Sequence, residues 1–387
     1  MTTSLSTPPA SVSSYLCPTI ATIDLSALAH NLAELRRGLD LRCAILAIVK
    51  ADGYGHGSIA VAEALSKLGV TKFGVSTIQE GATLREAGIQ GTIIVLGGIF
   101  CWQIRDLLHY QLTPVISDVG IAQQLVNELS PKDMPFPVHV KVDTGMRRLG
   151  FDPTSLSEFL TSDLFQGPLA LKSLMTHLAD ADNLNSSFTI QQLAEFQSIA
   201  HHLRQEGITI PCLHSANTAG IVSYPESHMD MVRPGLLLYG YAPLRPAAHH
   251  LSLKPVLSLS TKVVQTRAVA ADEPLSYNGI YRTSRPSRIG VLPIGYAHGY
   301  NRQLSEQGCV LIGNMRAPVV GKICMDMTLI NLTDVPKAQV GDDVILIGRQ
   351  GNETISAADV ATWQHSVPYE VLCSIGPRVN RVYEPMI

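Results

Sequence analysis

Residues 44–57, AILAIVKADGYGHG, decide how this chain folds. The six apolar residues at 44–49 are enough for one strand that is buried on both faces, and they end at Lys50 in a glycine-rich loop. An amphipathic, helix-like stretch follows at 58–68. A buried strand, a loop and a helix make up the repeating unit of a parallel sheet.

The same unit recurs through the first two thirds of the chain. Seven further apolar runs lie at residues 72–77, 92–98, 112–117, 138–143, 171–178, 212–217 and 231–238. Amphipathic stretches such as 78–87, 121–129 and 189–204 separate them. Eight parallel strands covered by helices on their outer side predict an α/β barrel of the (β/α)8, TIM type. A doubly wound open sheet is the alternative, because periodicity does not show whether a sheet closes.

The sequence changes character at about residue 251. Segments such as KPVLSLSTKVVQTRAV (254–269) and SRIGVLPIGY (287–296) are β-branched and partly alternating. They predict a mostly antiparallel β-domain at 251–387, with one helix at 356–365. We assign 18–250 to the barrel and expect disorder in the Ser-, Thr- and Pro-rich residues 1–17. A strand expected at about 19–25 has no obvious place in the barrel.

Composition narrows the class of protein. A chain of 387 residues with 46% hydrophobic and 16% charged residues is typical of a two-domain globular protein. A net charge of −3 without a basic run argues against nucleic acid, and no apolar stretch reaches the length of a membrane span. The seven scattered cysteines fit neither a zinc site nor a disulfide framework, so we expect no metal. With no secretory signal at the N-terminus, the expected compartment is the cytoplasm.

The ends of the predicted strands carry the candidate chemistry, because barrels place reacting groups there. An isolated lysine is usually a solvated surface group, but Lys50 is followed by a glycine-rich loop with Tyr54 and His56. Burial there would lower the lysine pKa toward nucleophilic use. Asn217-Thr218 and Gly235-Leu236 follow the last two strands, where barrels commonly bind phosphate. A strand-end lysine facing a phosphate site indicates a pyridoxal-phosphate pocket.

These motifs resemble those of the alanine racemase family, and the resemblance runs from about Ile20 to Tyr383. VKADGYGHG (49–57) is similar to the family's cofactor-lysine motif, which implies that Lys50 forms the aldimine and that Tyr54 contacts the phosphate. KVDTGMRRLG (141–150) resembles the segment that carries a carbamylated lysine and a substrate-binding arginine, here Lys141 and Arg148.

Other motifs supply the remaining site residues by the same resemblance. Three further barrel motifs resemble those of the family: MTHLADAD (175–182), HSANTAG (214–220) and MVRPGLLLYG (231–240). The first implies a supporting group, His177, and an entrance residue, Asp182. The other two imply five cofactor contacts: Asn217, Thr218, Arg233 beside the pyridine nitrogen, Gly235 and Leu236. In the β-domain, the resemblance implies a second base, a cofactor contact, a substrate contact and two entrance residues: Tyr277, Tyr369, Met325, Tyr296 and Arg302. His177 and Met325 also admit purely structural roles.

The resemblance implies a head-to-tail homodimer in which the β-domain of one subunit covers the barrel mouth of the other. The unplaced strand at 19–25 would join the β-domain. The implied reaction interconverts L- and D-alanine with two bases, Lys50 and Tyr277, and supplies D-alanine for peptidoglycan. A chain Tyr277–His177–Arg233 would stabilise the phenolate. An arginine facing the ring nitrogen only donates, which would leave that nitrogen unprotonated and suppress transamination.

The sequence leaves other functions open, and it departs from the family's usual motifs at three positions. The same scaffold could racemise serine or a wider range of amino acids, serve a decarboxylase, or carry pyridoxal phosphate without catalysis. An aldolase using Lys50 would leave Arg233-Pro-Gly unexplained. Gly53, Arg147 and His298 stand where the family commonly has alanine, glycine and aspartate. The remaining histidines of the barrel helices and the loop residues, such as His201 and His202, are expected at the surface.

Overall fold

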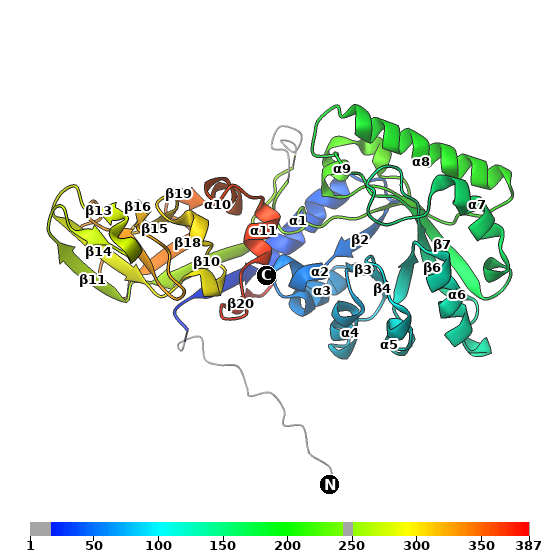
Figure 1. The fold of residues 1–387 in the computed structure, drawn as a ribbon, viewed down its shortest axis with the longest axis horizontal. Helices are drawn as coiled ribbons and strands as arrows, with labels where there is room; N and C mark the ends of the chain where they lie inside the picture. Colours follow the sequence, from blue (N-terminus) through cyan, green and yellow to red (C-terminus); the bar gives the residue numbers. More distant parts are fainter. Residues whose placement is uncertain (1–16, 243–250, 387) are drawn as a thin grey trace, which may run out of the picture. The chain divides into compact units, whose positions relative to one another are not determined.

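The computed structural model describes residues 17–242 and 251–386, which divide into two compact units (Figure 1). The barrel unit is Leu25–Lys254, and the β-unit combines the described residues up to Asp24 with Pro255–Pro385. The disorder expected for residues 1–17 falls, except for Cys17, outside the described residues.

Eight parallel strands form the barrel. They are β2 (Ala44–Ile48), β3 (Lys72–Val75), β4 (Thr92–Val95), β5 (Thr113–Ile116), β6 (Phe136–Lys141), β7 (Leu169–Met175), β8 (Leu213–His214) and β9 (Met231–Val232), in the order β8-β7-β6-β5-β4-β3-β2-β9. Backbone hydrogen bonds from Asp230 N–H to Leu213 C=O (3.1 Å) and from Arg233 N–H to Ala216 C=O (3.0 Å) join the two ends. The sheet therefore closes, and the predicted barrel is confirmed over the open sheet.

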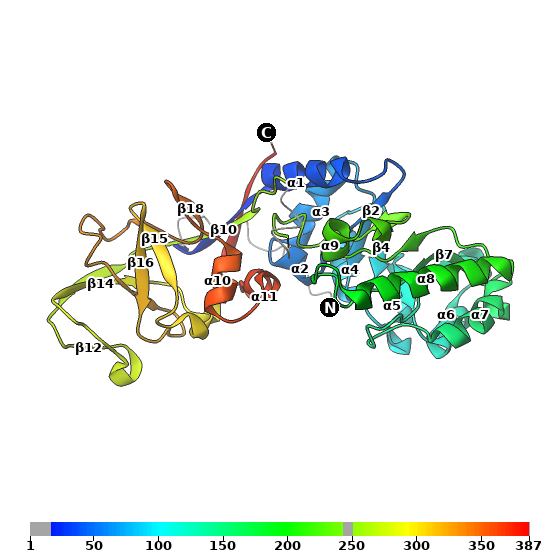
Figure 2. The ribbon, with the colours of Figure 1, turned by 90° about the horizontal axis from the view of Figure 1, so that it is seen from above.

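Helices cover the outer side of the barrel strands (Figures 1 and 2). They are α1 (Leu25–Arg37), α3 (Ser58–Lys67), α4 (Ile78–Glu86), α5 (Ile104–His109), α6 (Val119–Glu128), α7 (Pro153–Thr161), α8 (Ser187–Gln205) and α9 (Thr218–Ser223). Their starts are encoded locally, since Thr77, Asp118, Asp152 and Ser186 each accept a backbone N–H of the first turn. In the described ranges, none of the helices is both long and apolar enough to span a membrane.

The last predicted strand, 231–238, is wrong in extent because β9 stops at Val232. Pro234 has no backbone N–H to continue the ladder, and the chain then turns, with Leu238 N–H donating to Gly235 C=O at 2.9 Å. Leu237 and Leu238 are nevertheless fully buried, which explains their apolar character. The turn places Gly235 and Leu236 at the end of the barrel where the strands finish.

The β-unit is a largely antiparallel sheet. Its strands are β1 (Ile20–Asp24), β10 (Leu257–Lys262), β11 (Gln265–Val269), β14 (Ser287–Leu292), β15 (Cys309–Ile312), β16 (Met315–Val320), β17 (Thr328–Asn331), β18 (Asp343–Gln350), β19 (Glu353–Ile355) and β20 (Asn380–Glu384). The order is β11-β14-β17-β16-β15-β18-β10-β1-β20, with β19 on β18. β1 lies between β10, antiparallel, and β20, parallel. A two-stranded hairpin, β12 (Pro274–Leu275) with β13 (Tyr281–Arg282), extends from this sheet (Figure 2).

The β-unit has two α-helices in its described part where the sequence predicted one. The expected helix at 356–365 is α10 (Ala357–Trp363), and its start is fixed by a capping box between Ser356 and Asp359. The second, α11 (Pro368–Cys373), begins with Pro368 and has six residues. Six residues span less than two turns, so no apolar periodicity marks this helix in the sequence.

Candidate active site

Lys50 lies directly beyond β2, at the start of a left-handed turn, α2 (Lys50–Tyr54). Ala51, Asp52 and Tyr54 adopt φ values of 51°, 52° and 54°, which cost free energy for residues with a Cβ. Glu80 holds the turn by accepting the Ala51 N–H at 2.7 Å, and Asp52 accepts the Ser58 N–H at 2.8 Å. Such strain, held by surrounding contacts, is common at functional sites.

Gly53, one of the departures from the family pattern, belongs to the same turn. Its φ is 62°, and a Cβ at this position would lie 3.3 Å from the backbone of Ser58. A glycine therefore lowers the strain of the turn beside Lys50 rather than disturbing the turn.

Four of the predicted cofactor residues meet across the barrel mouth. A Cβ on Gly235 would lie 2.5 Å from the Tyr54 hydroxyl oxygen, and the Gly235 N–H donates to the Thr218 hydroxyl at 3.0 Å. Asn217 caps α9 by accepting the Gly220 N–H at 2.9 Å. Hydroxyls and loop amides gathered around a glycine suit a phosphate group. Leu236, the neighbour of Gly235, is buried, so its side chain packs into the barrel.

Replacing Gly235 with alanine is expected to weaken cofactor binding. The added Cβ must displace the Tyr54 hydroxyl, which would move the phosphate ligands apart. We expect roughly tenfold or greater loss of cofactor affinity, of the order of one charge-assisted hydrogen bond. Spectroscopic titration of the apoprotein with pyridoxal phosphate measures the change.

The matched control for that substitution is Gly167→Ala. Gly167 has an ordinary φ, and a Cβ there would meet nothing within 4 Å. Its affinity for the cofactor should equal that of the wild type. An unchanged affinity in Gly235→Ala would contradict the assignment of this glycine to the phosphate site.

Arg233 is buried, and its guanidinium is held by backbone carbonyls and histidines. It donates to the carbonyls of Thr176 and Ser215, both at 2.8 Å, and to Nδ1 of His214 at 2.9 Å. Nδ1 of His177 lies 3.4 Å from the same side chain. Burial lowers the pKa of Arg233 to about 10, so the side chain remains a cation near neutral pH. No described carboxylate forms an ion pair with Arg233, so its positive charge can attract an anionic ligand at the barrel mouth.

His177 is partly buried and neutral near pH 7. Burial, followed by the positive charges of Arg233, Lys141, Arg148 and Lys50, lowers its pKa well below the usual value. A neutral imidazole can accept a hydrogen bond from Arg233 and still offer its other nitrogen as a donor.

Lys141 ends β6 with its side chain buried near Arg148. Burial, followed by repulsion from Arg148 and Arg233, lowers the pKa of Lys141 to about 8. Arg148 is exposed in the loop that follows. Asp182, predicted at the entrance, is also exposed. The barrel mouth is therefore strongly cationic, with Arg148, Arg233 and Lys50 close enough to Lys141 to lower its pKa.

Three of the five predicted residues of the β-unit lie on neighbouring segments. Tyr277 follows β12 in a turn that is tied to the chain near Met325, since the Ser276 hydroxyl donates to Lys322 C=O at 2.9 Å. Tyr296 N–H donates to Cys324 C=O at 3.1 Å. The side chains of Tyr277, Tyr296 and Met325 are 64%, 45% and 53% exposed, so this face offers large side chains without burying them.

The other β-unit residues differ in exposure and in their partners. Tyr369 is partly buried in α11, and Arg302 is exposed. Asp326 forms an ion pair with Arg378 at 2.7 Å. His298 is buried and accepts the Gly295 N–H at 3.3 Å, so this departure packs inside the unit instead of facing an entrance.

Sequence reasoning missed several residues that hold the site together. His214 lies between Arg233 and the barrel interior, although it is the first residue of the quoted HSANTAG motif. Tyr239 packs its ring on Tyr54 at 5.1 Å and donates to Ile48 C=O at 3.0 Å. The expectation of surface histidines holds for His201 and His202, which are exposed. His56, beside Lys50, and the strand residues His139 and His214 are buried.

Comparison with known proteins identifies relatives along nearly the whole chain. Models of the alanine racemase N-terminal and C-terminal domains match residues 23–243 and 256–383. The alanine racemase of Halothermothrix orenii is 40% identical over 371 residues, which are 96% of this chain and 98% of that protein.

Solved structures give the same result. Alanine racemase from E. faecalis superposes with a TM-score of 0.89 at 32% identity, over 97% of this chain and 100% of that one. Alanine racemase from Bartonella henselae with covalently bound pyridoxal phosphate gives 0.86 at 30% identity, over 95% and 100%.

The closed barrel, its strand-end lysine and the separate β-unit define the class of this protein: it is an isomerase, a pyridoxal-phosphate-dependent amino-acid racemase. Within that class, the chain belongs to the alanine racemase family.

Proposed function

We propose that this protein interconverts L- and D-alanine in the cytoplasm, supplying D-alanine for peptidoglycan, as a homodimer with pyridoxal phosphate bound to Lys50. The observation that carries the proposal is the cationic barrel mouth, where the charges of Lys50, Lys141, Arg148 and the buried Arg233 all act on His177. A substrate carboxylate and a cofactor phosphate are the anions that such a mouth suits. The relative with covalently bound pyridoxal phosphate supports this choice of cofactor.

The described residues fit that cofactor. The space around Gly235, which a Cβ would fill, suits a phosphate beside Tyr54, Thr218 and the amides of Gly235 and Leu236. Arg233 would face the ring nitrogen, and Asn217 and Tyr369 would contribute further contacts. When bound, pyridoxal phosphate delocalises the electron pair that remains after an amino acid loses its α-proton.

Two proton carriers on opposite faces of the substrate would complete the reaction. We assign Lys50 Nζ to one face and the Tyr277 hydroxyl to the other, with Tyr277 contributed by the partner subunit. Lys50 would remove the α-proton of D-alanine and protonate the same face when D-alanine forms, and Tyr277 would do the same for L-alanine, so the substrate does not have to turn over in the site.

Arg233 would keep the ring nitrogen of the cofactor unprotonated. A guanidinium stays protonated at the pKa of about 10 that burial gives it, so it would donate a hydrogen bond to the ring nitrogen of the bound cofactor without giving up its proton. His177, neutral and in contact with Arg233, would link Arg233 to the Tyr277 hydroxyl.

Arg148 would bind the substrate carboxylate, with Lys141 as its positioning residue. The pKa of about 8 leaves part of the Lys141 side chain as a neutral amine near pH 7.5, and that amine can add to carbon dioxide with loss of one proton. The resulting carbamate is an anion that would pair with Arg148. Met325, Tyr296, Asp182 and Arg302 would shape the substrate pocket and its entrance.

Lys141→Ala is expected to be about tenfold or more less active, because Arg148 loses the anion that orients it. Added acetate should restore part of the activity by taking the place of the carbamate. Acetate added to the wild type controls for general salt effects. Failure of acetate to rescue, together with an unmodified Lys141 in a high-resolution experimental map, would remove this role.

Incubation of the purified protein with L-alanine, and separately with L-serine, tests the substrate. Chiral separation should show D-alanine formed at a clearly higher kcat/KM than D-serine. Faster racemisation of serine would favour a serine or broader racemase, and no turnover of either by yellow, cofactor-loaded protein would favour a non-catalytic carrier.

Tyr277→Phe tests the two-base assignment. L- and D-alanine have equal free energy, so this variant must lose steady-state catalysis in both directions. In single-turnover exchange, solvent deuterium should still enter D-alanine through Lys50 and hardly enter L-alanine. Equal exchange into both enantiomers would favour one base.

A further inference from the structure

A chain of buried polar side chains runs from Arg233 through the interior of the barrel. Arg233 contacts Nδ1 of His214 at 2.9 Å, and Nε2 of His214 lies 2.9 Å from the Ser173 hydroxyl. That hydroxyl also bonds Nδ1 of His139. His139, Ser173 and His214 are all buried, although barrel interiors are usually filled by branched apolar side chains.

Only one assignment of donors and acceptors is consistent along this series of hydrogen bonds. Arg233 has donors only, so Nδ1 of His214 accepts and its proton is on Nε2, because burial keeps the pKa of His214 well below its usual value. Nε2 then donates to the Ser173 oxygen, and the Ser173 hydroxyl donates to Nδ1 of His139. His139 must therefore carry its proton on Nε2, where the described residues offer no hydrogen-bond acceptor.

His139 lines a cavity of about 630 Å³ at the end of the barrel where the strands begin. Ala44, Lys72, Thr92 and Thr113, which also line it, are the first residues of β2, β3, β4 and β5. Lys50, by contrast, lies two residues beyond Ile48, the last residue of β2. The cavity is therefore at the opposite end of the barrel from the site described above.

The charges at this cavity favour an anion. Arg42, Lys72 and Lys172 line it with one carboxylate, Asp230, which already accepts the Leu213 N–H at 2.7 Å. Neither lysine forms an ion pair with a described residue, whereas Arg42 pairs with Asp40 at 3.3 Å. Burial, and then the charges of Lys72 and Lys172, lower the pKa of His139 to about 4. The imidazole is thus a neutral donor in a positive field.

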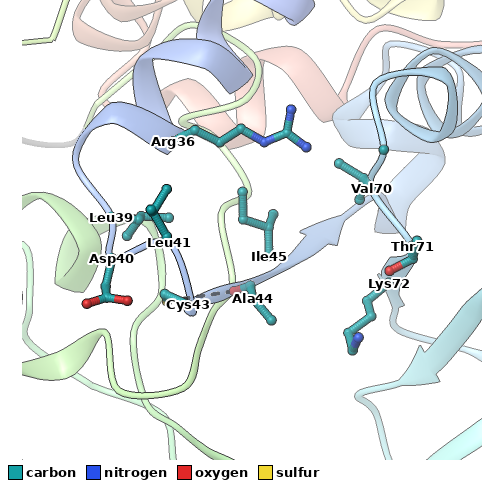
Figure 3. A pocket seen from close by; sticks show the side chains of 11 residues that line it. Arg36, Leu39, Asp40, Leu41, Cys43, Ala44, Ile45, Val70, Thr71 and Lys72 are labelled. Carbon is teal, nitrogen blue, oxygen red and sulfur yellow. Dashed lines mark hydrogen bonds between the residues drawn. The ribbon is translucent and has the colours of Figure 1, made fainter.

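In a neighbouring cavity, by comparison, polar side chains already have partners within the protein. It shares Ala44 and Lys72 with the first and is lined by Arg36 and Asp40 (Figure 3). Arg36 donates to Leu68 C=O at 2.9 Å, and Asp40 pairs with Arg42. These groups have partners within the chain, so this second cavity does not call for a ligand.

We propose that the cavity at the start of the barrel strands binds a small oxyanion, a phosphate or carboxylate group, between Lys72, Lys172 and the Nε2–H of His139. Binding there would add to stability rather than to chemistry, because a ligand held only by the folded barrel shifts unfolding by mass action. This site is independent of the proposed racemisation, which takes place at the other end of the barrel.

The test measures binding of inorganic phosphate, and separately of acetate, to the cofactor-loaded protein by calorimetry. Saturating alanine is present so that the mouth of the barrel is occupied. We expect saturable binding of at least one anion, with a rise in Tm. The two arms distinguish a phosphate ligand from a carboxylate. The double variant Lys72→Ala/Lys172→Ala should bind at least about tenfold more weakly, since each removed lysine is a charge-assisted contact.

Lys254→Ala/Lys337→Ala is the matched control, because it removes two exposed lysines that line neither cavity. Its anion affinity should equal that of the wild type. His139→Phe keeps a buried ring and removes the donor, so it should also bind more weakly. Absence of saturable binding of both anions, or equal affinity in the two double-lysine variants, would overturn the proposal.

Discussion

Lys50→Ala will fold and will hold no cofactor covalently, and its racemisation of alanine will fall by roughly 10³-fold or more. The proposed function gives Lys50 two tasks, the bond to the cofactor and one of the proton transfers. The backbone should tolerate alanine, because the turn is held by Glu80 on the Ala51 amide and by Asp52 on the Ser58 amide.

Borohydride reduction followed by peptide mapping locates the bond. In the wild type, the cofactor mass should appear on the peptide that contains Lys50. Lys67→Ala, at an exposed position that ends α3, controls for loss of a lysine charge and should label like the wild type. Reduced cofactor on Lys141, or on any other lysine, would refute the assignment.

Coexpression of Lys50→Ala and Tyr277→Phe is expected to recover about a quarter of wild-type activity in the whole dimer population, and about half in the isolated mixed dimers. Lys50 belongs to the barrel unit and Tyr277 to the β-unit, and the proposed head-to-tail dimer completes each site with two subunits. In a mixed dimer, one site then receives both defects and the other receives none. Random pairing makes half of the dimers mixed, and half of their sites are intact.

Coexpression with two different affinity tags isolates the mixed species, and each homodimeric variant is the inactive control. If each site belonged to one chain, every site would carry one defect and no activity would return. An inactive mixed dimer that still binds the cofactor would therefore sink the shared-site proposal.

The sequence predicted most of the barrel from local patterns. Apolar runs such as 44–49 and 92–98 gave strands because segments buried on both faces must be apolar throughout, and caps such as Thr77 and Ser186 fix helix starts. The sequence did not predict the extent of the two-residue strand β9 or the presence of the six-residue helix α11. β9 ends at Val232 ahead of Pro234, and α11 is too short to show a period.

The candidate site was predictable as a set of motifs and not as a set of contacts. Lys50, Asn217 and Thr218 could be named because strand ends in a barrel carry the reacting groups, whereas Arg233 was named through the family resemblance. The contacts of Arg233 with Thr176, His177 and His214 link segments separated by 19 to 57 residues, so no local pattern reveals them.

The sequence by itself determined the eight strand–helix units, the lysine that ends the first strand and the change to a β-rich unit near residue 251. Tertiary structure alone decided the closure of the sheet, the position of β1 between β10 and β20, and the burial of His139 and His214. The reason is physical. A strand buried on both faces has no apolar–polar alternation, so its sequence does not tell which side chains point inward. Only packing against strands distant in the chain brings Arg233, His214, Ser173 and His139 into one hydrogen-bonded chain.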